Sequence, residues 1–164
     1  MSSETILAVV AGVGLAAACG FRVFVPLLVL GAAARAGHLD LVPGFAWLAG
    51  TPALVALGVA TAVEILAYHV PWLDHLLDLA GAPLAVLAGV TVVAASADEL
   101  SPVLRWAVAI ITGGGAAGLF QGWNGLLRVG STVHTAGVGN PALASLETAG
   151  AFSLAGLAVL LPVA

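Results

Sequence analysis

The sequence predicts an all-α, polytopic helical membrane protein in which residues 1–164 form a single transmembrane domain. Hydrophobic residues make up 62% of the chain and charged residues only 7%, and the mean hydropathy is +1.17. A soluble domain has about half apolar and about a quarter charged residues, so a water-soluble fold of this composition could not cover its surface. A spanning helix needs about 20 apolar residues, which leaves room for about five spans in the lipid bilayer.

The first apolar run extends from Thr5 to Ala36 and is interrupted only by Arg22. As one straight helix its 32 residues would measure about 48 Å, against a hydrocarbon core of about 30 Å. Pro26 removes a backbone donor and clashes with the helix one turn earlier, near Arg22. We therefore expect a broken or kinked segment, with a freed carbonyl beside the guanidinium.

Prolines delimit the middle of the chain. After an aromatic-rich connection at 37–50, Thr51 followed by proline is typical of a helix start and begins a second span that ends near Tyr68. Residues 72–78 then have the pattern of a short amphipathic helix at the membrane interface. A third span, 83–97, is short for a full crossing.

The second long segment, also expected to be broken or kinked, begins at Ser101 and continues to about Gly137. Asn140, again followed by proline, starts the last span. In this layout Arg35 and Arg105 lie on one side of the membrane. The positive-inside rule then places the N-terminus outside and the C-terminus inside.

Polar side chains and regularly spaced glycines occur together in the second long segment. An arginine at the bilayer centre costs about 2.5 to 3.5 kcal/mol, so such groups must face protein, water or a ligand. Glycines four residues apart leave a strip of backbone that another helix can approach, which predicts a helix-packing face used for homo-oligomer assembly. The glycines of this face are Gly114, Gly118 and Gly122.

Four ionised groups lie within the predicted spans, and each needs a partner or water nearby. One interpretation is an ion or substrate site. Its candidate residues are Arg22, Glu64, Gln121, Asn124, Arg128, Ser131, Thr132 and Glu147. The alternative is a set of buried salt bridges that only fix helix packing.

Two short sequence matches raise the alternative of a weak inverted repeat, with halves 5–68 and 104–162 joined by 69–103. The stretch 50–54 matches 139–143, in both cases between a long run and the next span. An offset of three crossings would give the two copies opposite orientations, as in secondary transporters. Such matches also arise by chance in a chain this rich in alanine, glycine, leucine and valine.

No cofactor and no metal site are predicted. His75 and Asp78 are weak metal candidates because they share a helix face, and haem or metal binding through His69, His75 or His134 is a further alternative. No catalytic signature surrounds the single cysteine or the histidines, so we do not expect an enzyme. With four arginines and lysine absent from the chain, the sequence offers no basic surface for nucleic acid.

Three groups of motifs resemble one family. They are Gly20-Phe21-Arg22 with Pro26; Glu64 with Pro71, Asp74 and Asp78; and Arg128 with Gly139-Asn140-Pro141 and Glu147. Together they resemble the small bacterial membrane proteins described as domain of unknown function 4126, over most of the chain. Members commonly have an Asp-Lys pair where this chain has Tyr68 and His69, so no role is carried over to those two positions. The resemblance implies residence in a membrane, which we take to be the bacterial inner membrane, and no particular activity.

Our first functional hypothesis is a small integral membrane transporter or channel for a small ion, with anions as one candidate class. Arg22 and Arg128 would attract the ion, Asn124 and Ser131 would orient it, and Glu64 or Glu147 would carry a coupled proton. The alternative is a structural or accessory subunit of a membrane complex, in which the same charges only lock helix packing.

Overall fold

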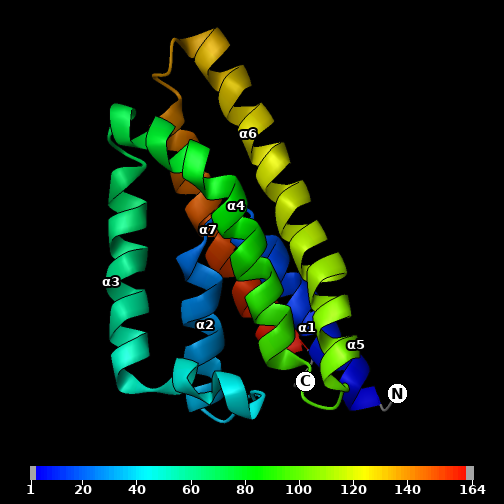
Figure 1. Ribbon diagram of the computed structural model, residues 1–164. Coiled ribbons are helices and arrows are strands. Elements are labelled where there is room, and N and C mark those ends of the chain that lie inside the picture. Colours follow the sequence, from blue (N-terminus) through cyan, green and yellow to red (C-terminus); the bar gives the residue numbers. More distant parts are fainter. Residues whose placement is uncertain (1–2, 162–164) are drawn as a thin grey trace.

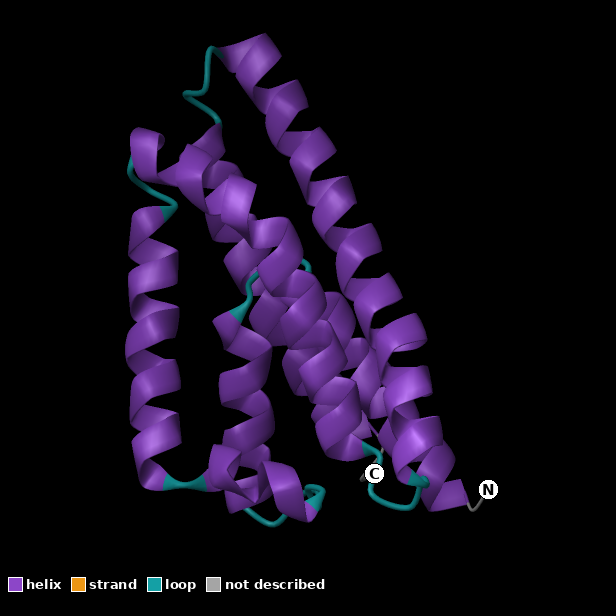
Figure 2. Ribbon diagram, in the orientation of Figure 1, coloured by secondary structure: helices purple, strands orange, loops and turns teal. Residues whose placement is uncertain are grey.

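The computed structural model describes residues 3–161, except for the side chains at 3, 4, 71, 72, 74–76, 78 and 79. This part of the chain is entirely helical (Figures 1 and 2). The elements are α1 (Ser3–Cys19), α2 (Phe24–Arg35), the 3-10 helix η1 (Pro43–Ala49), α3 (Thr51–Ala67), α4 (Pro71–Ser96), α5 (Pro102–Val108), the π-helix η2 (Ala109–Gly114), α6 (Gly115–Thr135) and α7 (Asn140–Leu160). The predicted all-α class is confirmed.

The first apolar run folds into a hairpin. α1 ends at Cys19, the chain turns over residues 20–23, and α2 leads back towards the end from which α1 started (Figure 1). Thr5, near the start of α1, and His38, just after α2, line the same cavity at that end. The predicted break near Arg22 is confirmed, but the run does not cross from one end of the molecule to the other. Pro26 lies in the first turn of α2, where a missing backbone donor costs little.

The third predicted span and the helix before it are one element. α4 is continuous from Pro71 to Ser96 with Pro83 inside it, so the prediction of a separate interfacial helix at 72–78 is wrong. Pro83 cannot donate to the preceding turn, but ending the helix there would have left several more backbone groups unpaired. A proline can therefore remain inside a helix of this kind.

The second long segment is one continuous helical rod of 34 residues, Pro102–Thr135, in which the π turn η2 replaces the expected kink. It ends at Ala136, which has a left-handed backbone (φ 52°), and α7 then returns. The two segments of the suggested repeat thus differ in shape, since 5–36 doubles back and 104–135 does not.

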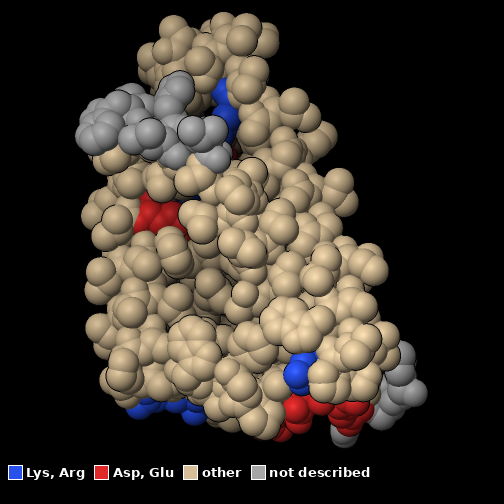
Figure 3. All heavy atoms as spheres, viewed as in Figure 1, with Lys and Arg blue, Asp and Glu red and all other residues tan. Residues whose placement is uncertain are grey.

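Both ends of the described chain lie at the same end of the molecule, at the bottom of Figure 1. Thr5 of α1 and Val159 of α7 line one cavity there, together with Asp40 and Glu99. The expectation that the termini lie on opposite sides is therefore wrong, because the hairpin of α1 and α2 removes one crossing. On the face shown in Figure 3, charged atoms gather mainly along this lower edge.

Two helices, Pro102–Thr135 and Asn140–Leu160, are long and apolar enough to cross a membrane. A third candidate is η1 together with α3, which meet at a bend of 64°. The structure thus supports a membrane protein with two or three candidate spans by length and composition, and the expected five are not found among the described residues.

Small residues fill the interior and large apolar residues cover the outside. The core between α1, α4 and α7 includes Ala16, Ala85 and Ala155, all fully buried. α4 and η2 approach so closely at Gly89 and Gly113 that a Cβ atom on either would collide with the carbonyl oxygen of the other. Many of the large apolar side chains point outward, as lipid contact requires; on α3 these are Val55, Val59, Val63 and Leu66.

Candidate functional site

The guanidinium of Arg22 is held inside the tip of the hairpin. Its Nε donates to Thr148 Oγ1 at 3.0 Å, Nη1 to the Phe21 carbonyl at 3.3 Å, and Nη2 to the Ala144 carbonyl at 2.7 Å. The residue is only 1% exposed. The expected freed carbonyl beside the guanidinium is present at Phe21, and the side chain also joins the tip to α7.

Side chains from α3 and α6 satisfy the rest of the broken backbone. Glu64 accepts the amide protons of Val23 at 2.7 Å and of Phe24 at 3.2 Å, one on each carboxylate oxygen. A carboxylate at the start of α2 also interacts favourably with the helix dipole. Asn124 Nδ2 donates to the carbonyl of Gly20 at 3.3 Å. The break is thus closed by groups far from it in sequence.

Glu147 of α7 is shared by both arginines. Its Oε2 lies 3.2 Å from Arg22 Nη1, and Arg128 binds both carboxylate oxygens, with Nε at 3.0 Å from Oε1 and Nη2 on Oε2. The ring of Tyr68 completes the cluster, since the guanidinium carbons of Arg22 and Arg128 lie 4.0 and 4.4 Å from its centroid. Such cation–π contacts strengthen when water is excluded.

Among the described side chains, Arg22 and Arg128 lie near two carboxylates, Glu147 between them and Glu64 at the adjacent tip. Burial of an unpaired charge would be far more costly than burial of charges that are paired in this way. Glu147 lies seven residues from the start of α7 and 13 from its end. At 1.5 Å per residue this places the cluster about 10 Å from one end of the helix and about 20 Å from the other.

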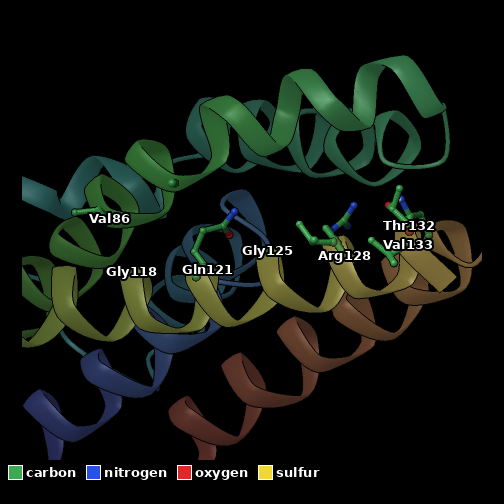
Figure 4. Close-up of a pocket in the computed structure, with 11 residues that line it drawn as sticks. Val86, Gly118, Gln121, Gly125, Arg128, Thr132 and Val133 are labelled. Atoms are coloured by element: carbon green, nitrogen blue, oxygen red, sulfur yellow. The ribbon is translucent and has the colours of Figure 1, made fainter. Parts of the chain in front are cut away.

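A cleft of about 540 Å³ lies beside the cluster, between the first half of α4 and α6 (Figure 4). Arg128 belongs to both, because its side chain is part of the cluster and also lines the cleft. The other residues that line the cleft are Ala82, Val86, Gly118, Gln121, Gly122, Gly125, Val129, Thr132, Val133 and Asn140.

The structure places the predicted site residues in two overlapping sets and leaves one residue outside both. Those in the buried cluster and tip are Arg22, Glu64, Asn124, Arg128 and Glu147. Those that line the cleft are Gln121, Thr132 and again Arg128. Ser131 belongs to neither set, because its hydroxyl faces the turn at Gly139, where an added Cβ would lie 2.8 Å from Ser131 Oγ.

Three contributors were missing from the sequence interpretation: Tyr68, Thr148 and Asn140. Tyr68 follows Glu64 by four residues and Thr148 follows Glu147 by one, so helical spacing from the charged residues was the available signal. Asn140 could have been found as the polar residue at the start of α7.

The expected oligomer face is occupied within the chain. Added Cβ atoms at Gly114 and Gly118 would lie 3.3–3.5 Å from side chains of Val86 and Val90 on α4, while Gly122 opens onto the cleft. Gly114 and Gly118 thus pack against α4 of the same chain, and use of this strip by a second copy stays a prediction.

The histidines show no metal-like arrangement among the described residues, where no three His, Cys, Asp or Glu side chains gather. Nδ1 of His69, in the turn after α3, lies 2.8 Å from the carbonyl oxygen of Ile65. Nδ1 of His134 lies 2.8 Å from the carbonyl oxygen of Gly130 in the same helix, α6. The side chains of His75 and Asp78 lie outside the described residues.

Comparison with known families provides one match, to a family model that covers residues 9–164. The chain belongs to the family described as a domain of unknown function, DUF4126. The resemblance noted in the motifs is thereby confirmed over nearly the whole chain. No curated protein and no solved structure matches it. Because the description of DUF4126 names no activity, the function of this member must be argued from the cluster and the cleft.

Proposed function

We propose that this DUF4126 member is a small integral membrane transporter or channel for a small ion, with anions as the favoured class. The observation that supports this most is that Arg128 both belongs to the charge cluster and lines the cleft. The residue is only 5% exposed. A guanidinium that borders a cavity is a suitable partner for an anion.

The other cleft residues support an anion as well. Gln121 and Thr132 offer an amide and a hydroxyl along the same wall of α6. Such neutral donors stabilise an anion without adding a fixed charge, so they allow it to leave again. In this proposal Glu147 carries the coupled proton, because it is the carboxylate in direct contact with Arg128.

The alternative, a structural or accessory subunit, is favoured by one observation. Arg22 has a side chain with no exposed surface, and each of its three nitrogens donates to a protein acceptor. A group of this kind locks helices together and does not need a ligand.

Location and assembly complete the proposal. We place the protein in the bacterial inner membrane, with its exposed apolar side chains in contact with lipid. A homo-oligomer stays part of the proposal. No enzymatic step is included.

The test is ion flux in proteoliposomes, screened with chloride, nitrate, phosphate and monovalent cations. We expect an anion flux that falls at least about tenfold in Arg128→Gln, which corresponds to about 1.4 kcal/mol of lost interaction with the ion. Arg35→Gln is the matched control, since Arg35 is exposed at the end of α2 and its Nη1 donates to Thr51 Oγ1, away from the cluster. Absence of any flux in the wild-type protein, or an equal loss in both variants, would contradict the proposal and favour the structural alternative.

A further inference from the structure

The cleft between α4 and α6 is too large for a small ion alone. Its volume of about 540 Å³ compares with about 30 Å³ for one water molecule. Along α6 it reaches from Gly118 past Arg128 to Val133, and the ten residues from Gly118 to Arg128 rise about 15 Å at 1.5 Å per residue. One leaflet of the hydrocarbon core is about 15 Å deep. The part of the cleft between Gly118 and Arg128 therefore has the length of a lipid tail.

Most of its wall is apolar and open to the side. Gly118 and Gly122 present no side chain, and Ala82 and Val86 form the opposite wall on α4. Figure 4 shows Val86 and Gly118 well away from Arg128. Gly122, which borders this half of the cleft, is exposed. In a bilayer this opening faces hydrocarbon, so an apolar chain could enter from the membrane.

The other half of the cleft is polar and lies closer to the end of the helix. Arg128 and Thr132 are together at this half in Figure 4. Arg128 is seven residues, or about 10 Å, from the end of α6 at Thr135. A lipid in a membrane has this same order, with its charged group near the interface and its tail towards the centre.

Asn140 indicates that an occupant of the cleft should carry a hydrogen-bond donor. It lines the polar half, is 9% exposed, and its Oδ1 has no hydrogen-bond partner among the described residues. Its Nδ2 donates to Thr132 Oγ1 at 3.2 Å, which identifies the free atom as the acceptor. A buried acceptor without a partner costs about 1–3 kcal/mol, so an occupant of the cleft should bring a donor.

We propose that the cleft binds a glycerophospholipid whose head group carries a hydrogen-bond donor beside the phosphate. The phosphate pairs with Arg128, an ammonium or hydroxyl group donates to Asn140, and one acyl chain lies along Gly122 and Gly118. A guanidinium suits a phosphate in charge and in geometry. The lipid would compete with the ion of the proposed function for Arg128, but its retention is measured without ion flux, so failure of one proposal can be told from failure of the other.

The test is lipid retention, measured by native mass spectrometry after mild detergent extraction from nanodiscs. The nanodiscs contain equal amounts of phosphatidylethanolamine and phosphatidylcholine with identical acyl chains. Both lipids have the phosphate, but only the ethanolamine has N–H donors. We expect the wild-type chain to retain phosphatidylethanolamine about tenfold in excess, the factor that one charge-assisted hydrogen bond contributes.

Gly122→Leu should abolish retention, because its side chain would fill the cleft without removing a charge. Gly130→Leu is the matched control, on the same helix, with open space at its Cβ and outside the cleft. An equal retention of the two lipids by the wild-type protein would overturn the proposal, whatever the variants do. So would full retention in a folded Gly122→Leu, or displacement of the lipid by free glycerol phosphate, which would show that the cleft takes the anion alone.

Discussion

Arg22 at the hairpin tip and Arg128 on the straight helix α6 share one carboxylate, Glu147, yet they differ in surroundings. The helix is interrupted at Arg22, and its guanidinium binds the Phe21 carbonyl there as well as Glu147 and the Ala144 carbonyl of α7. Arg128 lies within the continuous helix α6 and, besides its contacts in the cluster, borders the cleft. A buried arginine can thus lie at a chain break or border a cavity, and the local backbone distinguishes the two cases.

Glycines near the two arginines show the same difference. At the tip, a Cβ atom on Gly20 would lie 2.5 Å from Phe120 Cβ and 2.8 Å from the Ala117 carbonyl oxygen. On the cleft wall, a Cβ atom on Gly122 would meet nothing within 4 Å. The tip is closely packed against α6, whereas the wall near Arg128 faces open space.

Removal of the shared carboxylate should have the largest effect. Glu147→Gln would leave both guanidiniums buried without the anion between them, and loss of one partner from a buried ion pair costs about 3–5 kcal/mol. We expect a corresponding loss of unfolding free energy, measured by denaturation in detergent micelles. Asp40→Asn, at an exposed acid, is the control and should change little. A stability equal to the wild type would show that the cluster is not held by this charge.

The next prediction compares the loss of unfolding free energy when each of the two arginines is replaced. Arg22→Gln should lower the unfolding free energy by about 3 kcal/mol, because it removes one partner from Glu147, the donor to the Phe21 carbonyl and one donor to the Ala144 carbonyl, which keeps Thr148 Oγ1. Arg128→Gln should cost less, since Glu147 keeps its contact with the fully buried Arg22. Thermal unfolding of both variants in the same detergent tests this order. Equal losses would mean that the hairpin tip makes no special demand on Arg22.

The smallest effect is expected at the glycines. Gly20→Ala should destabilise by about 1–3 kcal/mol, because the methyl group cannot fit against α6 without a shift of backbone. Gly122→Ala should be neutral or stabilising by up to about 1 kcal/mol, since alanine favours a helix where space is free. Denaturant midpoints of the two variants measure the contrast. If Gly122→Ala were the more harmful of the two, α6 would have to lie closer to α4 than the cleft allows.

Part of the candidate site could be predicted from the sequence, one residue at a time. Charged groups in apolar segments are costly enough to be noticed, so Arg22, Glu64, Arg128 and Glu147 were identified as members of a site. Their pairing could not be read, because Arg22 and Glu147 lie 125 positions apart and Glu64 contacts amides rather than a charge. Ser131 was included for its chemistry alone, and its position on α6 turns it away from the cluster.

The two prolines show the same limit to what the sequence can predict about the fold. Pro26 and Pro83 look alike in the sequence, yet the chain turns back just before the first and continues as helix through the second. Local chemistry predicts that a proline weakens a helix at that point. Whether the helix then ends depends on which groups from other segments are at hand to bind the freed backbone, as Glu64 and Asn124 do at the tip.

The sequence by itself determined the helical membrane class, the break near Arg22, the start of α7 and the presence of charges that need partners. These depend on composition and on contacts within one or two helical turns, which the order of residues specifies. Only the tertiary structure decided that α1 and α2 form a hairpin, that Glu147 is shared, and that Arg128 borders a cleft while Arg22 does not. Each of these depends on which distant segments pack together, and in an interior made largely of alanine, glycine and valine many packings are chemically alike until the whole chain is in place.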